Sequence, residues 1–472
     1  IFLKKVLFIL NKHCGLEKTE IFYPEFLINF QNELISHDLE LSYVFFSENL
    51  KDINVKNKCI YEKEKFIHLS KKDISIQAKR IEKEYKFTFK QAFFPDILQT
   101  FKGQDGTSLL PPKIFFNELK PLVTKFLYLE ALIKKNNFDI IFSDVSPEYE
   151  MEFGRIIGNK FNKVVLKEAL GSALGNSVII KCNDFGDFKW IEVQGDQKFD
   201  LKSTEIFIET FLKFKKDPYK KFFTSSPKLS LIDKLKSKSL SSLVFSPLIL
   251  LKKFYNLTFI FFNKILKKIL LYEKLNIQDE YLFFGFQLSI ESTVTYKAFP
   301  YTNQIALIEM ISRVLPYNHF LYVREHPHWP EYYSYKFLKT LKSFPNIKII
   351  SPEISIHDIL SKSKGVITLN STTGIEALIH GKPVLSFSSN LYQGYHSSAI
   401  TCSNLFELGK KLVELINTDV SQQETISYVN RLKNNSLSIG LGSYNFYSNK
   451  DSQNKANIFA IYFKNIISKL EK

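Results

Sequence analysis

The segment LYVREHPHWP, residues 321–330, places charged side chains and two histidines directly after an apolar run. Proline cannot continue a strand ladder and holds the preceding residue extended, so Pro327 predicts that a strand ends just before it. His326 is therefore expected at a strand end. Ligands of open α/β sheets bind at the carboxyl ends of the strands. A histidine there can donate a hydrogen bond to a phosphate or to a leaving oxygen.

The second candidate segment is GVITLNSTTGIEALIHGKPVLSF, residues 365–387. An apolar run ends at Leu369, and a hydroxyl-rich turn leads into a helical pattern. Hydroxyls cap helix starts, and the free N–H groups there favour an anion. The turn predicted to bind a phosphate consists of Ser371, Thr372 and Thr373. An ordinary capped helix would use the same residues, and that interpretation stays open.

Two further residues of this segment have expected roles in the same site. Gly374 is expected to let a ligand approach the backbone closely. Glu376 lies in the first turn of the expected helix, where a carboxylate can accept hydrogen bonds from ribose hydroxyls.

The elements that would position these residues follow an alternating pattern. Strand patterns at 4–10, 137–146 and 163–171 alternate with helical patterns at 23–34 and 148–161. A second series has strand patterns at 279–289, 319–327, 346–351, 365–369 and 383–387, with helical patterns between them, and the helical run 454–470 comes last. This alternation of strand and helix patterns predicts an α/β protein with two doubly wound, Rossmann-like domains, a ligand cleft between them and a C-terminal helix.

The predicted boundaries follow changes in composition. An N-terminal α/β domain spans 1–198, a Lys-rich linker or helical insertion 199–278, a C-terminal α/β domain 279–444 and a terminal helix 445–472. Apolar residues in 240–275 are interrupted by lysines, as in helices that lie at a membrane interface. A helix packed on the protein with solvated lysines is the alternative, and both stay open. These lysines are Lys252, Lys253, Lys264, Lys267 and Lys268.

The amino-acid composition limits the class of protein and the kind of partner that can be expected. The 472 residues are 45% hydrophobic and 24% charged, which is typical of a globular protein. A net charge of +16, from 64 Lys and Arg against 48 Asp and Glu, predicts an anionic partner, unless it reflects a compositional bias. No nucleic-acid-binding module accompanies the charge, so nucleic acid is not expected as the partner. Scattered cysteines and histidines without metal-ligand spacing predict a reducing compartment and no metal site.

The segments YLFFGFQLSIEST, NQ, LPYNHFLYVREHP and LNSTTGIEALIHGKPVLSF, in this order, resemble the capsule polysaccharide biosynthesis family over residues 281–395. The resemblance implies a GT-B-like fold and metal-independent transfer from a CMP-linked sugar, as in β-Kdo transferases. It places His326 and Pro327 on the nucleotide phosphate, with Ser371 and Thr372 on the opposite side. It also implies that Gln287, Glu291 and Arg324 line the donor site, with Arg324 replacing the usual lysine and Ile290 the usual proline.

The N-terminal half resembles the family only loosely. Its acidic candidates for contacting the acceptor or stabilising developing positive charge are Glu168, Asp184 and Asp144. A transferase that acts on a hydroxyl needs such a group near that hydroxyl.

The resemblance implies a glycosyltransferase of bacterial surface polysaccharide biosynthesis, of the capsule or lipopolysaccharide type, which transfers Kdo or a related ulosonic acid to a glycan or lipid-linked acceptor. No cofactor beyond the nucleotide-sugar donor is expected. The expected location is the cytoplasm, at the inner face of the cytoplasmic membrane. The alternatives are a CDP-glycerol-type polyol-phosphate transferase, a nucleotide-sugar 2-epimerase and a non-catalytic membrane scaffold of polysaccharide export.

Overall fold

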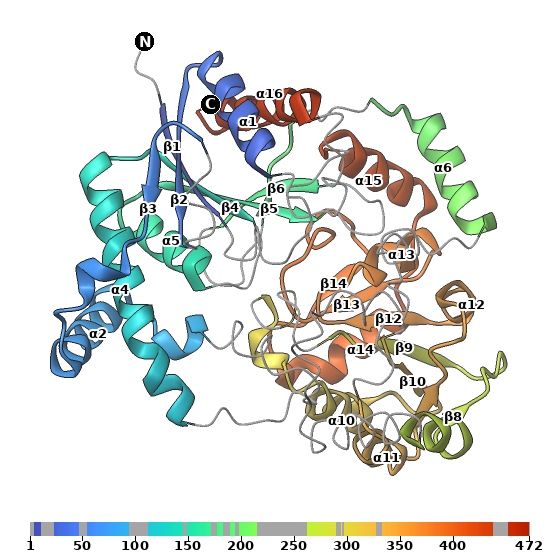
Figure 1. Ribbon diagram of the computed structural model, residues 1–472. Coiled ribbons are helices and arrows are strands. Elements are labelled where there is room, and N and C mark those ends of the chain that lie inside the picture. The colour runs from blue at the N-terminus through green and yellow to red at the C-terminus, as the bar shows by residue number, and fades with distance from the viewer. Residues whose placement is uncertain are drawn as a thin grey trace, which may run out of the picture.

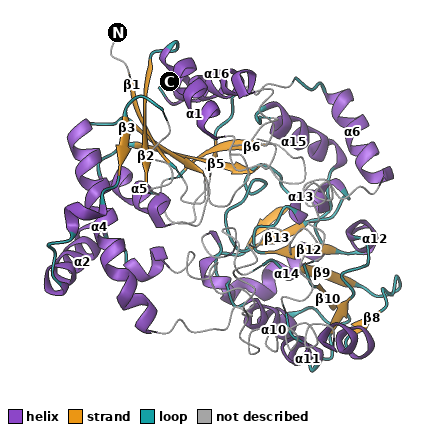
Figure 2. Ribbon diagram, in the orientation of Figure 1, coloured by secondary structure: helices purple, strands orange, loops and turns teal. Residues whose placement is uncertain are grey.

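Two sheets, each covered by helices on both faces, form the frame of the protein in a computed structural model (Figures 1 and 2). The structure describes residues 4–10, 23–46, 54–93, 112–144, 149–170, 177–182, 189–193, 198–214, 262–288, 294, 297–326, 333–437 and 452–471. Within these residues each sheet has seven strands.

The N-terminal sheet has the strand order β3-β2-β1-β4-β5-β6-β7. Its strands are β1 (Lys4–Ile9), β2 (Leu39–Phe45), β3 (Lys58–Ile60), β4 (Ile140–Asp144), β5 (Val164–Leu170), β6 (Ser177–Lys181) and β7 (Lys189–Trp190). The first five pair in parallel, whereas β6 and β7 are antiparallel. The predicted parallel sheet therefore ends in an antiparallel edge, which a short connection between neighbouring strands permits.

Within the described residues, helices lie on both faces of the N-terminal sheet. On one face lie α1 (Tyr23–Ile35) and α16 (Ser452–Leu470), which pack against each other (Figure 1). On the other face α5 (Tyr149–Lys160) packs on the strands, and α4 (Pro112–Asn136) and α2 (Lys71–Tyr85) pack with it. Gly154 lets α5 approach the sheet, because a Cβ there would lie 2.1 Å from the Ile9 side chain. The predicted terminal helix is thus part of the N-terminal domain in space.

The C-terminal sheet has the order β14-β13-β12-β9-β10-β11-β8, and all its pairs are parallel. Its strands are β8 (Tyr272–Glu273), β9 (Tyr281–Gly285), β10 (Phe320–Arg324), β11 (Ile347–Ile350), β12 (Gly365–Thr368), β13 (Val384–Ser386) and β14 (Ala399–Thr401). Alternate residues of β9 enter different cores: Leu282 and Phe284 one, Tyr281 and Phe283 the other. Such strands are buried on both faces, as the continuous apolar runs predict.

Within the part of the chain that the structure describes, helices on both faces of the sheet supply the other half of these two cores. One face is covered by α10 (Gln304–Val314), α11 (Tyr335–Lys342) and α14 (Leu408–Ile416). The opposite face is covered by α12 (Ile356–Lys362), α13 (Thr373–Ile379) and α15 (Gln422–Asn434). Short 3-10 helices occur at Lys63–Phe66, Phe299–Tyr301 and Leu405–Glu407.

The two domains contact each other through the end of the N-terminal domain. Tyr395 packs its ring 4.5 Å from that of Trp190 and donates a hydrogen bond to its carbonyl oxygen at 3.2 Å. Arg431 of α15 forms an ion pair with Glu192. The helix α6 (Leu201–Phe214) then packs beside α15 (Figure 1).

The α/β class and the two doubly wound domains are confirmed. The segment 199–278 differs from the predicted linker in its last part. A helix at 262–270 and strand β8 belong to the C-terminal domain, because β8 pairs with β11. Lys252 and Lys253 lie outside the described residues. Among the residues that are described, no helix has both the length and the apolar character needed to cross a membrane.

Candidate functional site

Three neighbouring strands bring the predicted site residues to one edge of the C-terminal sheet. β9 lies between β10 and β12, and the register pairs Gly285 with Arg324 and Phe284 with Ile367. All three strands run in parallel, so their carboxyl ends meet at the same edge. Neighbouring strands lie about 4.8 Å apart, which separates the ends of β10 and β12 by about 10 Å. His326 follows the first of these ends and Ser371 the second, with Gln287 after the strand between them.

Gln287 ties the end of β9 to the loop after β12. Its side-chain oxygen accepts hydrogen bonds from the Thr368 hydroxyl at 3.4 Å and the Asn370 backbone N–H at 3.3 Å. Its side-chain nitrogen donates to Asn370 Oδ1 at 3.1 Å. Its own backbone is held by Gln304, whose amide both accepts from the N–H and donates to the carbonyl. Gln287 is buried, so the structure gives it a positioning role beneath the site.

One hydroxyl of the turn after β12 binds a backbone N–H at the start of the following helix, as the hydroxyl-rich pattern allows. The Ser371 hydroxyl accepts a hydrogen bond from the Thr373 backbone N–H at 3.1 Å. Thr372 stands at the N-cap position of α13 but makes no side-chain capping hydrogen bond. All three hydroxyl residues of the turn are partly exposed. The hydroxyl of Thr372 therefore takes no part in capping the start of the helix, whereas that of Ser371 binds its first backbone N–H.

Gly374 and Glu376 both lie inside a tightly packed, seven-residue helix. A Cβ on Gly374 would lie 2.3 Å from Cζ of Tyr392, so the absence of a side chain is required by this ring. The Tyr392 hydroxyl also donates to the Ser371 carbonyl at 3.2 Å, which fixes the turn. The space at Gly374 that is predicted to admit a ligand is filled by the ring of Tyr392. Glu376 is buried in the first turn.

A buried ion pair supports the end of β10. Glu325 accepts a hydrogen bond from Lys267 Nζ at 2.9 Å, and the Tyr272 hydroxyl donates to its other oxygen. Lys267 also donates to the Tyr333 carbonyl at 3.0 Å. Burial, together with the negative charge of Glu325, holds the pKa of Tyr272 far above its ordinary value. The phenol therefore stays a donor, and the residue directly before His326 is fixed on two sides.

This pair corrects the prediction that Lys267 belongs to a row of exposed, membrane-facing lysines. Lys267 is 2% exposed, whereas Lys264 and Lys268 of the same helix are exposed. The physical reason is the buried carboxylate of Glu325, which would be costly without a cationic partner.

The remaining C-terminal candidates have separate environments. Arg324 is buried at the end of β10, and its guanidinium donates to the Ile354 carbonyl at 3.1 Å. His326 is partly exposed. Glu291, Ile290 and Pro327 lie outside the described residues.

Two of the three acidic candidates of the N-terminal domain, Asp144 and Glu168, lie on neighbouring strands. Glu168 is buried in β5, and alternation along the strand places it on the same face as Leu166, which packs in the core with α1 and α16. Asp144 ends β4 and pairs in register with Glu168, but its side chain lies outside the description. Asp184 is also outside the described residues.

A lysine that the sequence analysis missed lies where the domains approach each other. Burial lowers the pKa of Lys297 to about 8; Cys182 opposes this shift, and the positive charge of Lys167 adds to it. Lys297 follows β9 in the C-terminal domain, whereas Cys182 directly follows β6 and Lys167 lies in β5 of the other sheet. Charged groups of both domains therefore lie within electrostatic range of one another.

Long-range partners explain what sequence reasoning missed. Lys267 and Glu325, or Gln287 and Asn370, are far apart in the chain, and no local pattern links them. The motif Arg-Glu-His-Pro did contain one signal, a carboxylate at a buried strand end. Within the described residues, no three His, Cys, Asp or Glu side chains gather in a way that could hold a metal ion.

The comparisons with known proteins agree with the strand-end motifs. Residues 270–397 match the family model described as capsule polysaccharide biosynthesis protein, so the resemblance predicted from the motifs is confirmed over these residues. No curated protein matches the chain.

Solved structures are similar at low identity. The beta Kdo 2,7 transferase KpsC of Thermosulfurimonas dismutans is 18% identical, with a TM-score of 0.32, over 64% of this chain and 80% of that one. A UDP-GlcNAc 2-epimerase from Methanocaldococcus jannaschii is 12% identical, with a TM-score of 0.26, over 91% and 98%. Anabaena Alr3699/HepE, in complex with UDP and glucose, is 11% identical, with a TM-score of 0.26, over 99% and 97%.

Proposed function

We propose that the protein is a GT-B glycosyltransferase of bacterial surface polysaccharide biosynthesis. A nucleotide-sugar donor binds at the ends of β9, β10 and β12, and the N-terminal domain holds a glycan or lipid-linked acceptor. The observation that carries this proposal is the meeting of His326 and the Ser371–Thr372 turn at one sheet edge, inside the residues that match the capsule family model. The proposed donor is a CMP-linked ulosonic acid such as Kdo.

The proposed transfer needs one group that stabilises the negative charge on the departing phosphate and another that accepts the proton of the acceptor hydroxyl. The bond between the anomeric carbon and the phosphate oxygen breaks, and a bond to an acceptor hydroxyl oxygen forms. His326 and the Thr372 hydroxyl donate hydrogen bonds to the departing phosphate, so its charge is neutralised without a metal ion. The acceptor proton passes to a carboxylate, for which Glu168, Asp144 and Asp184 are the candidates.

A donor screen tests the proposal. The purified protein is incubated with CMP-Kdo, CDP-glycerol or UDP-GlcNAc, each with and without a glycolipid acceptor, and products are identified by mass spectrometry. We expect CMP-Kdo to release CMP only when the acceptor is present, with Kdo found on the acceptor. Transfer of glycerol phosphate would favour the polyol-phosphate transferase, and acceptor-independent conversion of UDP-GlcNAc would favour the epimerase. Absence of turnover with every donor would favour a scaffold.

Thr372 gives a prediction about which part of the nucleotide the turn contacts. Replacing Thr372 with alanine should weaken CMP binding by about 1.5–3 kcal/mol, the range for a hydrogen bond to a charged group. Binding of cytidine, which lacks the phosphate, should change little. The melting temperature should also hold, because this hydroxyl makes no capping bond. Calorimetric titration of both ligands is the measurement, with Thr372→Ser as the control that restores the hydroxyl. Equal losses for CMP and cytidine would remove the turn from the phosphate site.

We also propose that the helix at 262–270 lies against an anionic membrane surface, at the inner face of the cytoplasmic membrane. Phe262, Ile265, Leu266 and Ile269 recur at helical spacing and are 37–72% exposed. Lys264 and Lys268 are exposed beside this stripe. An exposed apolar face with flanking lysines and a net charge of +16 fits an acidic bilayer better than it fits water.

Replacing Lys264 and Lys268 together with glutamine should release the protein from vesicles rich in anionic lipid, because each lysine near such a surface contributes about 1 kcal/mol. Co-sedimentation with vesicles measures this. The matched control replaces Lys336 and Lys339, two exposed lysines of α11, and should leave binding intact. Lys267 is left in place because it is the partner of Glu325. Equal sedimentation of both variants would reject this surface.

A further inference from the structure

A cavity of about 460 Å³ opens in the N-terminal domain between the end of α2 and the helix α5. Its lining combines aromatic, amide and cationic groups, among them Tyr85, Phe87, Gln91, Arg155, Asn159 and Lys160. This volume is within the range of small-molecule sites, which is roughly 300–1,000 Å³. The candidate residues of the donor site take no part in this cavity.

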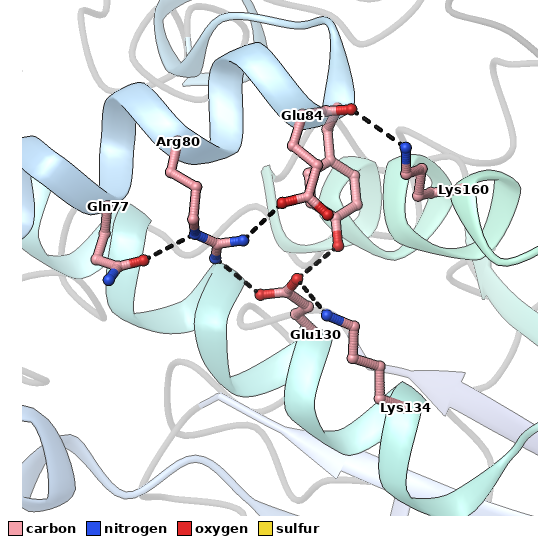
Figure 3. Close-up of polar contacts among 7 residues, drawn as sticks. Gln77, Arg80, Glu84, Glu130, Lys134 and Lys160 are labelled. Carbon is pink, nitrogen blue, oxygen red and sulfur yellow. Dashed lines mark hydrogen bonds and ion pairs between the residues drawn. The ribbon is translucent and has the colours of Figure 1, made fainter.

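The α2 wall of the cavity is held in place by a network of polar groups centred on the buried Glu130 (Figure 3). The Tyr85 hydroxyl donates to Glu130 at 2.7 Å, and Glu130 also accepts from Arg80 at 3.1 Å and Lys134 at 2.8 Å. Burial raises the pKa of Glu130, but these three hydrogen bonds outweigh burial and lower it overall. Glu130 therefore stays ionised, and Tyr85 is fixed as a wall of the cavity.

The second wall is tied to the first across the cavity. Figure 3 shows Lys160 of α5 directed toward α2, where its Nζ donates to the Glu84 carbonyl oxygen at 3.4 Å. Lys160 also lies 5.9 Å from the centre of the Tyr85 ring. Two helices linked in this way hold the cavity open without a ligand.

The acidic side chains of the lining already have cationic partners, whereas its exposed cations lie at the rim. Glu84 pairs with Arg80 at 2.7 Å, and both oxygens of Glu152 accept from Arg155 Nε at 3.0 Å. Lys86 and Lys160 are exposed at the opening. The field at the opening is therefore positive and favours an anionic ligand.

One lining residue of the cavity, Glu152, lies near groups that approach the other domain. Glu152 lies 4.0 Å from Lys167 of β5, and Lys167 lies within electrostatic range of Lys297 in the C-terminal domain. Glu152 is in the first turn of α5, which starts at the carboxyl edge of the N-terminal sheet. A chain-like ligand that reaches Glu152 would thus have one end near the C-terminal domain.

We propose that this cavity binds an anionic sugar unit of the acceptor glycan, which rests on the proposed function. Tyr85 and Phe87 offer apolar surface to the C–H face of a sugar ring, and the amides of Gln91 and Asn159 can bond its hydroxyls. Lys86 and Lys160 attract its carboxylate or phosphate, with Arg155 behind them. The cavity therefore selects acceptors by charge, at a distance from the donor site.

Binding of short oligosaccharides to the full chain tests this without any turnover. Saturation-transfer NMR and calorimetry would compare an oligogalacturonate, its neutral methyl ester and a sugar phosphate. We expect the charged probes to bind and the neutral ester to bind about tenfold or more weakly. Preference between carboxylate and phosphate identifies the natural anionic group. Equal binding of the neutral ester, or no binding of any probe, would overturn the proposal.

Variants locate the binding on the chain. Lys86→Gln with Lys160→Gln should weaken binding of the charged probe about tenfold. Lys83→Gln with Lys90→Gln, two exposed lysines close in sequence but outside the cavity lining, should leave it within about twofold. Equal losses in both variants would mean a general charge effect and would overturn the site. CMP titrated in parallel keeps the two proposals apart: CMP binding without saccharide binding refutes the cavity only, and the reverse refutes the proposed donor site only.

Discussion

Replacing His326 with alanine is expected to slow transfer about 10²–10³-fold, which corresponds to about 2.7–4 kcal/mol of lost transition-state stabilisation. The imidazole stands directly after Glu325, whose carboxylate is held by Lys267 and Tyr272, so the end of the strand is preorganised. A preorganised donor acts on charge that develops as the phosphate departs. The loss should therefore appear in kcat at saturating donor.

Two comparisons make this result specific. His326 is partly exposed, so the variant should melt close to the wild type. His68→Ala removes an exposed histidine of the N-terminal domain and should leave turnover unchanged. A His326→Ala protein with wild-type turnover would show that this side chain does not act on the leaving group.

Replacing Lys267 with methionine is expected to destabilise the protein by about 3–5 kcal/mol, because it leaves the carboxylate of Glu325 buried without its cation. Denaturation by urea, monitored on the full chain, measures the change. The same variant should bind nucleotide more weakly, since Glu325 precedes His326. Lys267 is thus expected to matter for folding and for the site together.

The neighbouring residue supplies the matched control. Lys268 is exposed, and its 3.9 Å contact with Glu353 lies in solvent, so Lys268→Met should change stability by less than about 0.5 kcal/mol. Pairing Lys267→Met with Glu325→Leu should recover much of the loss, because it removes both buried charges. Similar stabilities for Lys267→Met and Lys268→Met would contradict the buried pair.

The strands that frame the site were predictable because parallel strands buried on both faces form uninterrupted apolar runs. The apolar runs that end near Arg324 and Leu369 form β10 and β12. Because these strands run in the same direction, His326 and Ser371 lie at the same edge of the sheet. Polar residues directly after such runs fall at carboxyl strand ends. The position of these polar residues at the carboxyl edge of the C-terminal sheet could therefore be predicted from the local sequence pattern alone.

Features that depend on tertiary contacts could not be predicted in this way. A lysine among apolar residues has the same appearance whether it is solvated, as Lys268 is, or buried against a carboxylate, as Lys267 is. Only the fold brings that carboxylate close. The requirement for glycine at 374 likewise comes from Tyr392, which lies in the loop after β13 and contacts the turn.

The N-terminal domain was the harder half for a related reason. Its antiparallel edge, β6 and β7, follows a β5 that reads like the parallel strands before it. The cavity between α2 and α5 is assembled from the end of one helix and the side of another, and its charges are ordered by Glu130 from a third. Residues that share no segment and no periodicity leave no joint signal in a sequence.

A thermal-shift screen against CMP, CDP, UDP and GDP tests nucleotide binding at the edge of β9, β10 and β12 most directly. A ligand that binds only the folded protein stabilises it by about 2.7 kcal/mol at a concentration of 100 Kd. We predict that a cytidine nucleotide raises the melting temperature most, and that His326→Ala and Thr372→Ala reduce this rise while Lys268→Met does not. If no nucleotide shifts the melting temperature of the wild-type protein, or if the shift is the same in all these variants, the proposed donor site is wrong.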